Sequence, residues 1–207
     1  MGREIDFLKF PSVKRSRVST EKARKIAKRF DREFFDGKRE NGYGGYVYDG
    51  RWKPVARRLC DHYGLDYGDT VLDVGCAKGF LVKDLTNEGI DATGIDVSEY
   101  AISKAVTDRV YVCDARELRF DAEEFDLAVS INTLHNLKED EIAAVLSEIG
   151  IISVHQYIVL DAFKTKAQEK RIRDWNLTAQ TILHVDDWKK LFKRCGYNGD
   201  YAWTVMR

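Results

Sequence analysis

Acidic residues and glycines follow successive short apolar runs of this chain, at positions where a nucleoside-binding site needs them. The segment from Asp73 to Gly79 follows the first run. Gly75 permits a tight turn with close backbone approach, and Gly79 relieves packing where a helix meets a strand. Asp96 follows the second run, 21 residues after Gly75. A carboxylate there can accept hydrogen bonds from both vicinal hydroxyls of a ribose.

Two further runs end in polar residues. Asp114 and Ala115 follow the third run, and the Asp114 carboxylate can accept a hydrogen bond from an exocyclic amino group such as that of adenine. Residues 130–136, which include Asn132 and His135, follow the fourth run. Each of these signals is weak alone, because a strand-end aspartate is often only a helix cap. Together they favour a nucleoside ligand.

The elements that position these residues are short strands alternating with helices. The expected strands are 70–75, 92–96, 110–114, 125–131 and 156–161, and the expected helices are 52–63, 78–88, 98–105 and 140–149. Such alternation predicts an α/β fold with a doubly wound, mostly parallel, Rossmann-like sheet. Ligands bind such a sheet beyond the carboxyl ends of its strands.

Several runs of the chain resemble the class I S-adenosylmethionine-dependent methyltransferases. They are Val71-Leu-Asp-Val-Gly-Cys-Ala-Lys-Gly-Phe-Leu, Gly94-Ile-Asp-Val-Ser, Cys113-Asp-Ala and Phe125-Asp-Leu-Ala-Val-Ser-Ile-Asn-Thr-Leu-His. The resemblance covers roughly residues 68–163 and implies S-adenosylmethionine as the cofactor.

The resemblance also implies roles for individual residues. The loop Gly75, Cys76, Ala77 and Gly79 would cradle the methionine part of the cofactor, with Asp73 near its amino group. Asp96 would hold the ribose, with Val97 beside it, Asp114 and Ala115 would flank the adenine, and Ile131 and Asn132 would lie near the reacting methyl. The family's loop usually carries a glycine where this chain has Ala77. If that position needs positive φ, alanine costs on the order of 1 kcal/mol.

Residues 41–52 combine four glycines with Tyr43, Tyr46, Tyr48 and Trp52. Glycine at this density disfavours a helix or strand. We interpret the segment as a lid in which Tyr43 and Tyr46 contact the cofactor, because lids need hinges and tyrosines can both shield a ligand and hydrogen-bond to it. A loop fixed to the surface by its tyrosines is the alternative. The segment also loosely resembles small bacterial methyltransferases of carbohydrate or secondary metabolism.

The first forty residues are basic, with 13 Lys and Arg against 7 Asp and Glu, although the whole chain balances 34 against 34. Apolar residues at helical spacing predict one helix from Ser19 or Thr20 to about Gly37. Its apolar stripe would pack on the main domain, and its charges would form a solvated face. Binding of RNA or an acidic surface is the alternative.

Methyl transfer from a sulfonium is an in-line displacement, so the protein must align the acceptor, exclude water and deliver an unprotonated nucleophile. The candidate catalytic residues are His135, as a general base, with Tyr46 and Asp161. His184 is a second choice alongside Asp161. A buried histidine bonded to neighbouring backbone is the alternative interpretation of His135.

We therefore expect one domain over 1–207: a helical cap and lid (1–68), a cofactor core (69–163) and a substrate-side segment (164–207). The expected acceptor is an O or N atom of a small molecule. A nucleic-acid methyltransferase and a non-catalytic S-adenosylmethionine-binding protein remain alternatives. Overall neutrality argues against a polyanion as the main partner, and a homodimer is left open.

Other classes are not favoured. Scattered Cys and His residues predict no metal site, and a sequence without a signal peptide or an 18-residue apolar stretch predicts a cytoplasmic protein that does not cross a membrane.

The resembled family commonly ends in an antiparallel pair of strands. In this chain, either residues 178–184 supply the edge strand of that pair or the sheet is one strand short.

Overall fold

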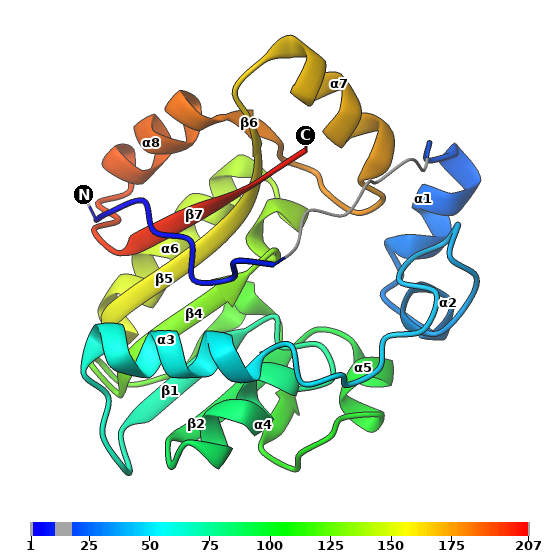
Figure 1. The fold of residues 1–207 in the computed structure, drawn as a ribbon. Coiled ribbons are helices and arrows are strands. Elements are labelled where there is room, and N and C mark those ends of the chain that lie inside the picture. The colour runs from blue at the N-terminus through cyan, green and yellow to red at the C-terminus, as the bar shows by residue number, and fades with distance from the viewer. Residues whose placement is uncertain (1, 11–17, 207) are drawn as a thin grey trace.

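Within residues 2–10 and 18–206, which the computed structural model describes, seven strands form one sheet and every pair of strands runs parallel (Figure 1). The strands are β1 (Thr70–Val74), β2 (Asp91–Asp96), β3 (Val110–Val112), β4 (Phe125–Ile131), β5 (Ser153–Phe163), β6 (Leu183–His184) and β7 (Asp200–Val205). The order β3-β2-β1-β4-β5 reverses direction between β1 and β4. The predicted doubly wound sheet is confirmed.

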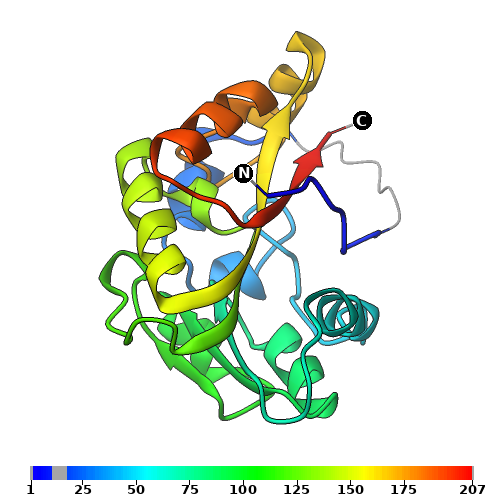
Figure 2. The same cartoon turned by 90° about the vertical axis from the view of Figure 1, so that its left-hand side faces the viewer.

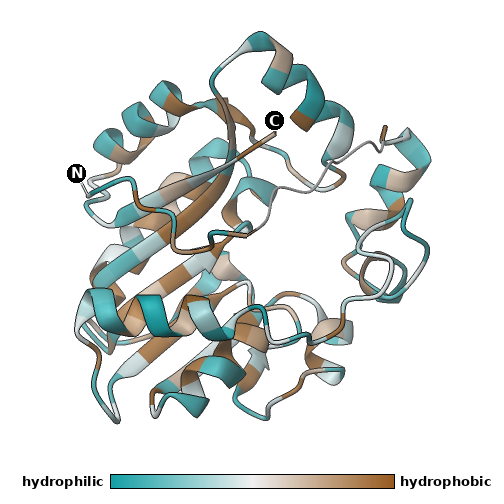
Figure 3. Cartoon of the chain, in the orientation of Figure 1, coloured by the Kyte–Doolittle hydropathy of each residue, from teal (hydrophilic) through white to brown (hydrophobic). Residues whose placement is uncertain are grey.

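Helices cover both faces of this sheet (Figure 2). These helices are α3 (Lys53–Tyr63), α4 (Phe80–Asn87), α5 (Glu99–Ser103), α6 (Glu139–Ile152), α7 (Lys166–Trp175) and α8 (Val185–Arg194), with 3-10 turns η1 (Ala115–Glu117) and η2 (Leu134–Asn136). Two further helices, α1 (Glu21–Ala27) and α2 (Arg32–Phe35), lie to one side of the sheet, where they contact each other and α2 contacts α5 (Figure 1). Successive strand residues face opposite sides, so Val71 packs toward α3 and α4 while Leu72 packs toward α6 and α8. Two covered faces explain the runs of buried apolar residues in the central strands β1, β4 and β5, which Figure 3 shows partly in brown.

The amino-terminal helix is two helices, not the predicted single one. α1 begins after Thr20, whose side chain accepts a hydrogen bond from the Ala23 amide, as predicted for that cap. The helix ends before Phe30, which has φ 50°. Asp31 then caps α2 through the Glu33 amide. The apolar periodicity continued across this break, so it could not reveal the second cap.

The carboxyl-terminal strands correct the expected antiparallel pair. β7 runs parallel to β5, with Tyr157 opposite Asp200 and Ala162 opposite Val205. β6 pairs with β5 only at Ala162 and Phe163. Because Ala162 has a partner on each side, β6 continues in line beyond the end of β4. Residues 183–184, within the expected segment 178–184, therefore form a strand. This strand does not lie at the outer edge of the sheet.

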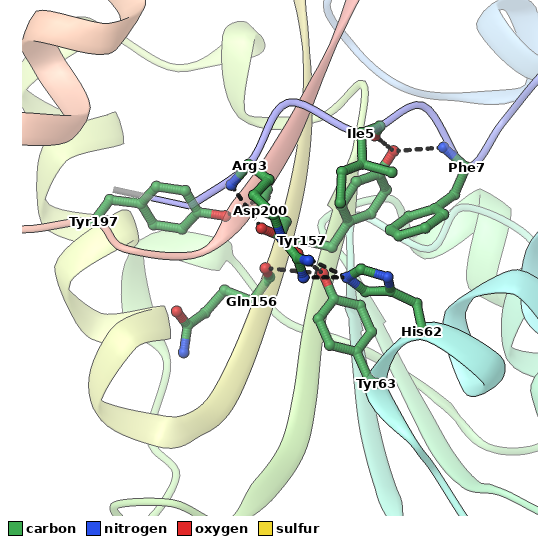
Figure 4. A network of polar contacts seen from close by, with 9 residues as sticks. All are labelled: Arg3, Ile5, Phe7, His62, Tyr63, Gln156, Tyr157, Tyr197 and Asp200. Carbon is green, nitrogen blue, oxygen red and sulfur yellow. Dashed lines mark hydrogen bonds and ion pairs between the residues drawn. The ribbon is translucent and has the colours of Figure 1, made fainter.

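An amino-terminal segment takes the outer edge instead. Glu4 forms a parallel bridge with Tyr201, and the Ile5 amide donates to the Tyr201 carbonyl at 2.8 Å. Polar contacts anchor the segment at the first residue of β7, as Figure 4 shows: the Arg3 amide donates to Asp200 at 2.7 Å. The Tyr157 hydroxyl donates to the Ile5 carbonyl at 3.1 Å.

The register of the sheet creates a step beside β1. Asp73 pairs with Val129, which pairs with Tyr157, so β1 ends one residue above this row. β5 continues for six more residues, to Phe163. β5 and β7 therefore extend beyond the level of the loop that follows β1.

Candidate functional site

The loop after β1 is held in an unusual backbone conformation. Gly75, Ala77 and Gly79 all have positive φ, of 85°, 50° and 71°. A Cβ on Gly75 would lie 2.1 Å from the Thr133 hydroxyl oxygen, so only glycine fits there. Ala77 does adopt the left-handed conformation, so the cost that alanine has at positive φ applies here. The Asp96 carboxylate offsets part of that strain, because it accepts a hydrogen bond from the Ala77 amide at 2.8 Å.

Cys76 and Asp73 lie inside the protein beneath this loop. Cys76 packs on Gly94, and burial raises the pKa of its thiol. Asp73 is 5% exposed, and no hydrogen bond from the described residues reaches its carboxylate. Burial, with the nearby negative charge of Asp96, raises the pKa of Asp73 to about 7. A buried carboxylate without a donor is suited to receive an ammonium group.

Asp96 ends β2 beside the same loop. Its two oxygens accept from the Ala77 and Ser98 amides, each at 2.8 Å. Burial raises its pKa, and these two hydrogen bonds oppose that effect. A carboxylate has about four acceptor positions, so the side chain retains capacity for two hydroxyl groups. Val97 follows it with 52% of its surface exposed, which leaves an apolar surface next to the acid.

Asp114 is already bound to another side chain. It caps η1 through the Arg116 amide at 2.9 Å and forms an ion pair with the Arg116 guanidinium. This hydrogen bonding to Arg116 lowers the pKa of Asp114. Ala115 begins η1 and packs against the core between the sheet and α6. Contact of Asp114 with an adenine stays a prediction.

The glycine- and tyrosine-rich segment packs over the first turn of α4. The Tyr46 ring stacks on Phe80 with centroids 4.7 Å apart and planes 16° apart. The Tyr46 and Tyr43 ring centroids are 4.4 Å apart. Burial, together with Tyr43, Asp73 and Asp96, raises the pKa of Tyr46 well above its usual value, so the phenol remains neutral. Tyr46 is thus close to both site carboxylates, whereas the Tyr48 hydroxyl donates to Asp84 on α4 at 2.5 Å.

Ile131 and Asn132 end β4 on the other side of the loop. Ile131 packs partly against the core on the α3 and α4 face. Asn132 is exposed and has φ 56°, a conformation that asparagine tolerates better than most residues. Its amide oxygen accepts from the Thr204 hydroxyl at 2.8 Å, which fixes which way the amide points. The parallel direction of β7 is what brings Thr204 to this edge of the sheet.

His135 and Asp161 form a buried pair beside these residues. His135 is 3% exposed, and its Nδ1 accepts from the Asp161 backbone amide at 3.2 Å. The neutral ring therefore carries its proton on Nε2, which lies 3.7 Å from the Asp161 carboxylate. Asn176 donates to that carboxylate at 2.5 Å. Burial lowers the pKa of His135, and Asp161 opposes this effect.

This geometry matches the alternative interpretation of His135, a buried histidine bonded to backbone. The backbone carbonyl of His135 also accepts from the amides of Gln180 and Thr181, which ties η2 to the segment between α7 and β6. Both ring nitrogens are directed toward Asp161. Proton transfer by His135 or Asp161 stays a prediction, whereas the pair clearly positions the end of β4 against residues 176–181.

Sequence reasoning missed Lys78, which lies inside the loop between Ala77 and Gly79. Only 6% of Lys78 is exposed. Its ammonium donates to both oxygens of Asp36, at 2.6 and 2.8 Å, and to the Tyr46 carbonyl at 2.8 Å. A lysine within a glycine loop could have indicated a role for Lys78. Its partner Asp36 lies 42 residues away in the chain, so the local sequence does not reveal the pair. Within residues 2–10 and 18–206, no group of three or more His, Cys, Asp or Glu side chains is gathered to hold a metal ion.

Comparison with known proteins identifies the core of the chain. A family model described as a methyltransferase domain matches residues 71–152, the segment that contains the loop, Asp96 and β4. The core is a class I S-adenosylmethionine-dependent methyltransferase domain. Its cofactor is S-adenosylmethionine. A solved S-adenosylmethionine-dependent methyltransferase from Archaeoglobus fulgidus shares the fold, with a TM-score of 0.57 and 20% identity over 70% of this chain and 68% of that one.

Two curated relatives extend the likeness beyond the core. The chain is 27% identical to the sterol 24-C-methyltransferase of Saccharomyces cerevisiae, over 66% of this chain and 42% of that protein. It is 24% identical to the 27-O-demethylrifamycin SV methyltransferase of Amycolatopsis mediterranei, over 72% of this chain and 61% of that protein. The chain thus spans about half the length of these relatives.

The geometry of Gly75, Asp73 and Asp96 fits S-adenosylmethionine. Gly75 is a position where the backbone alone can face a ligand, because any side chain would strike Thr133. Asp73 lacks a donor for its buried carboxylate, and Asp96 keeps acceptor capacity. An ammonium group at Asp73 and ribose hydroxyls at Asp96 would satisfy both acids.

Proposed function

We propose that this chain transfers a methyl group from S-adenosylmethionine to an oxygen or nitrogen atom of a small molecule. The observation that carries the proposal is the buried Asp73 carboxylate, which accepts no hydrogen bond from the described residues and lies beside Asp96, beneath a loop in which Gly75, Ala77 and Gly79 have positive φ. The two curated relatives are named for a sterol and a rifamycin, and both names support a small-molecule acceptor. Carbohydrates and secondary metabolites are the acceptor classes to test first.

The cofactor supplies a methyl group already activated on a sulfonium, so the chain's residues mainly bind, orient and exclude water. Asp73 would hold the amino group, Asp96 the ribose, and Asp114 with Ala115 the adenine. Tyr46 would cover the site, because its ring is fixed on Phe80 near both acids. Asn132, oriented by Thr204, would offer its amide hydrogens to the acceptor.

The organisation of the chain is part of the proposal. Residues 1–68 would form the cap and lid, 69–163 the cofactor core and 164–207 the acceptor side of one domain. None of the described helices is both long and apolar enough to span a bilayer. A cytoplasmic location and a homodimer remain predictions from the sequence.

The cofactor experiment is a binding measurement. S-adenosylmethionine and S-adenosylhomocysteine should each raise the melting temperature, while NAD should not. Asp96→Ala should weaken binding by about 1 to 3 kcal/mol, because a charged hydrogen-bonded contact is lost. The absence of a shift with either methyl-cycle ligand would overturn the cofactor assignment for this chain.

The acceptor experiment is a methyl-transfer screen over a metabolite extract, in which the product gains the mass of one methylene group. His135→Ala tests the general-base role, because near-normal turnover would exclude it. Cofactor binding without transfer to any metabolite or nucleic acid would favour the non-catalytic alternative.

One observation supports the nucleic-acid alternative. Lys22, Lys25 and Arg29 line a hollow of about 580 Å³ on the outer face of α1, together with Glu21 and Ile26. Polyanion binding through such a face weakens steeply with added salt, because counterions are released. Transfer RNA that becomes methylated, with binding that falls steeply between low and physiological salt, would favour this alternative over the small molecule.

A further inference from the structure

One carboxylate joins the cap to the cofactor loop. Asp36 is the residue after α2, and each of its two oxygens accepts a hydrogen bond from the Lys78 ammonium. It also accepts from the Tyr46 amide at 3.0 Å and from the Tyr100 hydroxyl at 2.8 Å. Four segments therefore meet at one side chain: the end of α2, the glycine- and tyrosine-rich segment, the cofactor loop and α5.

The surroundings make this junction stronger than an ordinary surface ion pair. The side chains of Lys78 and Asp36 are 8% and 26% exposed. Partial burial opposes ionisation of Asp36, yet Lys78, the Tyr46 amide and Tyr100 together lower its pKa, so the carboxylate is charged at neutral pH. Among residues 2–10 and 18–206, Asp36 is the only carboxylate that pairs with Lys78. Loss of the partner of a mostly buried ammonium is costly, because the charge is left uncompensated.

Lys78 is also the residue next to Ala77, which is where the loop is strained. Asp96 holds the Ala77 amide from the sheet side, and Asp36 holds Lys78 from the cap side. The left-handed conformation of Ala77 persists only while its neighbours fix it. Release of Lys78 would remove one of these two restraints.

We propose that Asp36 is a positioning residue that couples docking of the cap to the binding-competent conformation of the cofactor loop. The inference rests on the proposed function, since it assigns a remote residue to the same cofactor site. Asp36 acts through Lys78 and Tyr46 and touches no cofactor atom itself. Because coupling is reciprocal, the cofactor must stabilise the docked cap by the same factor by which the docked cap strengthens cofactor binding.

The test measures S-adenosylhomocysteine binding by calorimetry, at a temperature where every variant is folded by circular dichroism. Asp36→Asn keeps the shape and removes the charge. It should weaken binding about 10-fold, which corresponds to about 1.4 kcal/mol. Asp49→Asn is the matched control, because that exposed carboxylate pairs with Arg51 inside its own segment, and its binding should stay within about two-fold.

A double-variant cycle separates coupling from general damage. Lys78→Met should weaken binding as Asp36→Asn does, and the double variant should lose little more than either single variant, because both break one interaction. Proteolysis of the cap gives the reciprocal measurement. S-adenosylhomocysteine should protect the cap of the wild type and should protect the cap of Asp36→Asn less.

Several results would overturn the inference. A folded Asp36→Asn that binds with wild-type affinity would show that the junction is only structural, and additive effects of the two single variants would show the same. If Asp36→Asn does not fold, Tyr100→Phe removes one hydrogen bond to the same carboxylate and should weaken binding by about two- to five-fold; an unchanged affinity would contradict the coupling. A wild type that fails to bind would overturn the proposed function as well.

Discussion

Asp73 and Asp200 lie in one row of the sheet and on one face, with β4 and β5 between their strands, yet their surroundings are opposite. The register runs from Asp73 through Val129 and Tyr157 to Asp200. Asp200 accepts from the Arg3 amide, from His62 at 3.0 Å and from Tyr63 at 3.3 Å. Asp73 receives no such bond from the described residues.

The pKa values follow from this difference. Burial opposes ionisation of Asp200, but hydrogen bonds from Arg3 and His62 lower its pKa overall. Burial and the charge of Asp96 raise the pKa of Asp73 to about 7. A carboxylate satisfied by the protein stabilises the fold, whereas a carboxylate left unsatisfied lowers stability and is available to a ligand. The comparison thus separates, within one row, an acid whose hydrogen bonds the protein supplies from one to which the described residues donate none.

The largest expected effect is on the structural acid. Asp200→Ala should lower the free energy of unfolding by about 2 to 3 kcal/mol, because His62, Tyr63 and the Arg3 amide all lose their acceptor. Urea unfolding measures the loss. Asp187→Ala on α8, an exposed acid paired with Lys190, is the control and should change stability by less than about 0.5 kcal/mol. Equal losses of unfolding free energy in Asp200→Ala and Asp187→Ala would show that Asp200 stabilises the fold no more than an exposed acid does.

The binding acid should behave in the reverse way. Asp73→Asn should leave stability at neutral pH unchanged or higher, because a buried charge is removed. The same change should weaken S-adenosylhomocysteine binding by about 10- to 100-fold, since a charge-assisted hydrogen bond is lost. Calorimetry on the folded variant checks this result, and unchanged affinity would show that Asp73 does not hold the ligand.

The two acids should also respond to pH with opposite signs. The folded pKa of Asp73 is raised, so its contribution to stability is present at low pH and is lost as pH rises from about 4 to about 7. The folded pKa of Asp200 is lowered, so its contribution is present above about pH 4 and is lost on further acidification. Urea unfolding of wild type and Asp73→Asn between pH 5 and 7 should diverge in favour of the variant, by about 1 kcal/mol per pH unit. Parallel curves would contradict the raised pKa.

The smallest expected effect concerns the loop between the two site acids. Ala77→Gly relieves a left-handed alanine with φ 50° but loosens the unfolded chain, so it should stabilise the protein by about 0.5 kcal/mol. Thermal unfolding measures the gain. A lower melting temperature in Ala77→Gly would mean that the neighbours already compensate the strain.

Local patterns in the sequence predicted much of this architecture. The first five strands were predicted because short apolar runs alternate with helical patterns, and β4 has the predicted bounds. A positive φ at Ala77 was considered only as a condition, because the resembled family usually has glycine there, and the structure shows that φ is positive. The sequence also placed Asp73 and Asp96 at adjacent strand ends, where the structure brings them close enough for one charge to shift the pKa of the other.

Long-range pairing is what local patterns could not reveal. The direction of β7 depends on where α8 delivers the chain, and a six-residue strand has the same pattern in either direction. The bond between Asp36 and Lys78 joins residues 42 positions apart. The whole of α7 and the edge segment at Glu4 were not predicted, since neither has a strong apolar period of its own.

The edge segment has a consequence for synthesis of the chain. Residues 3–5 pair with residue 201, so a contact near the start of the sequence waits for a strand made almost 200 residues later. During translation this segment has no strand to join until β7 has left the ribosome. Its docking must therefore follow the synthesis of β7, and a fluorophore near Glu4 quenched by Trp203 would time that step.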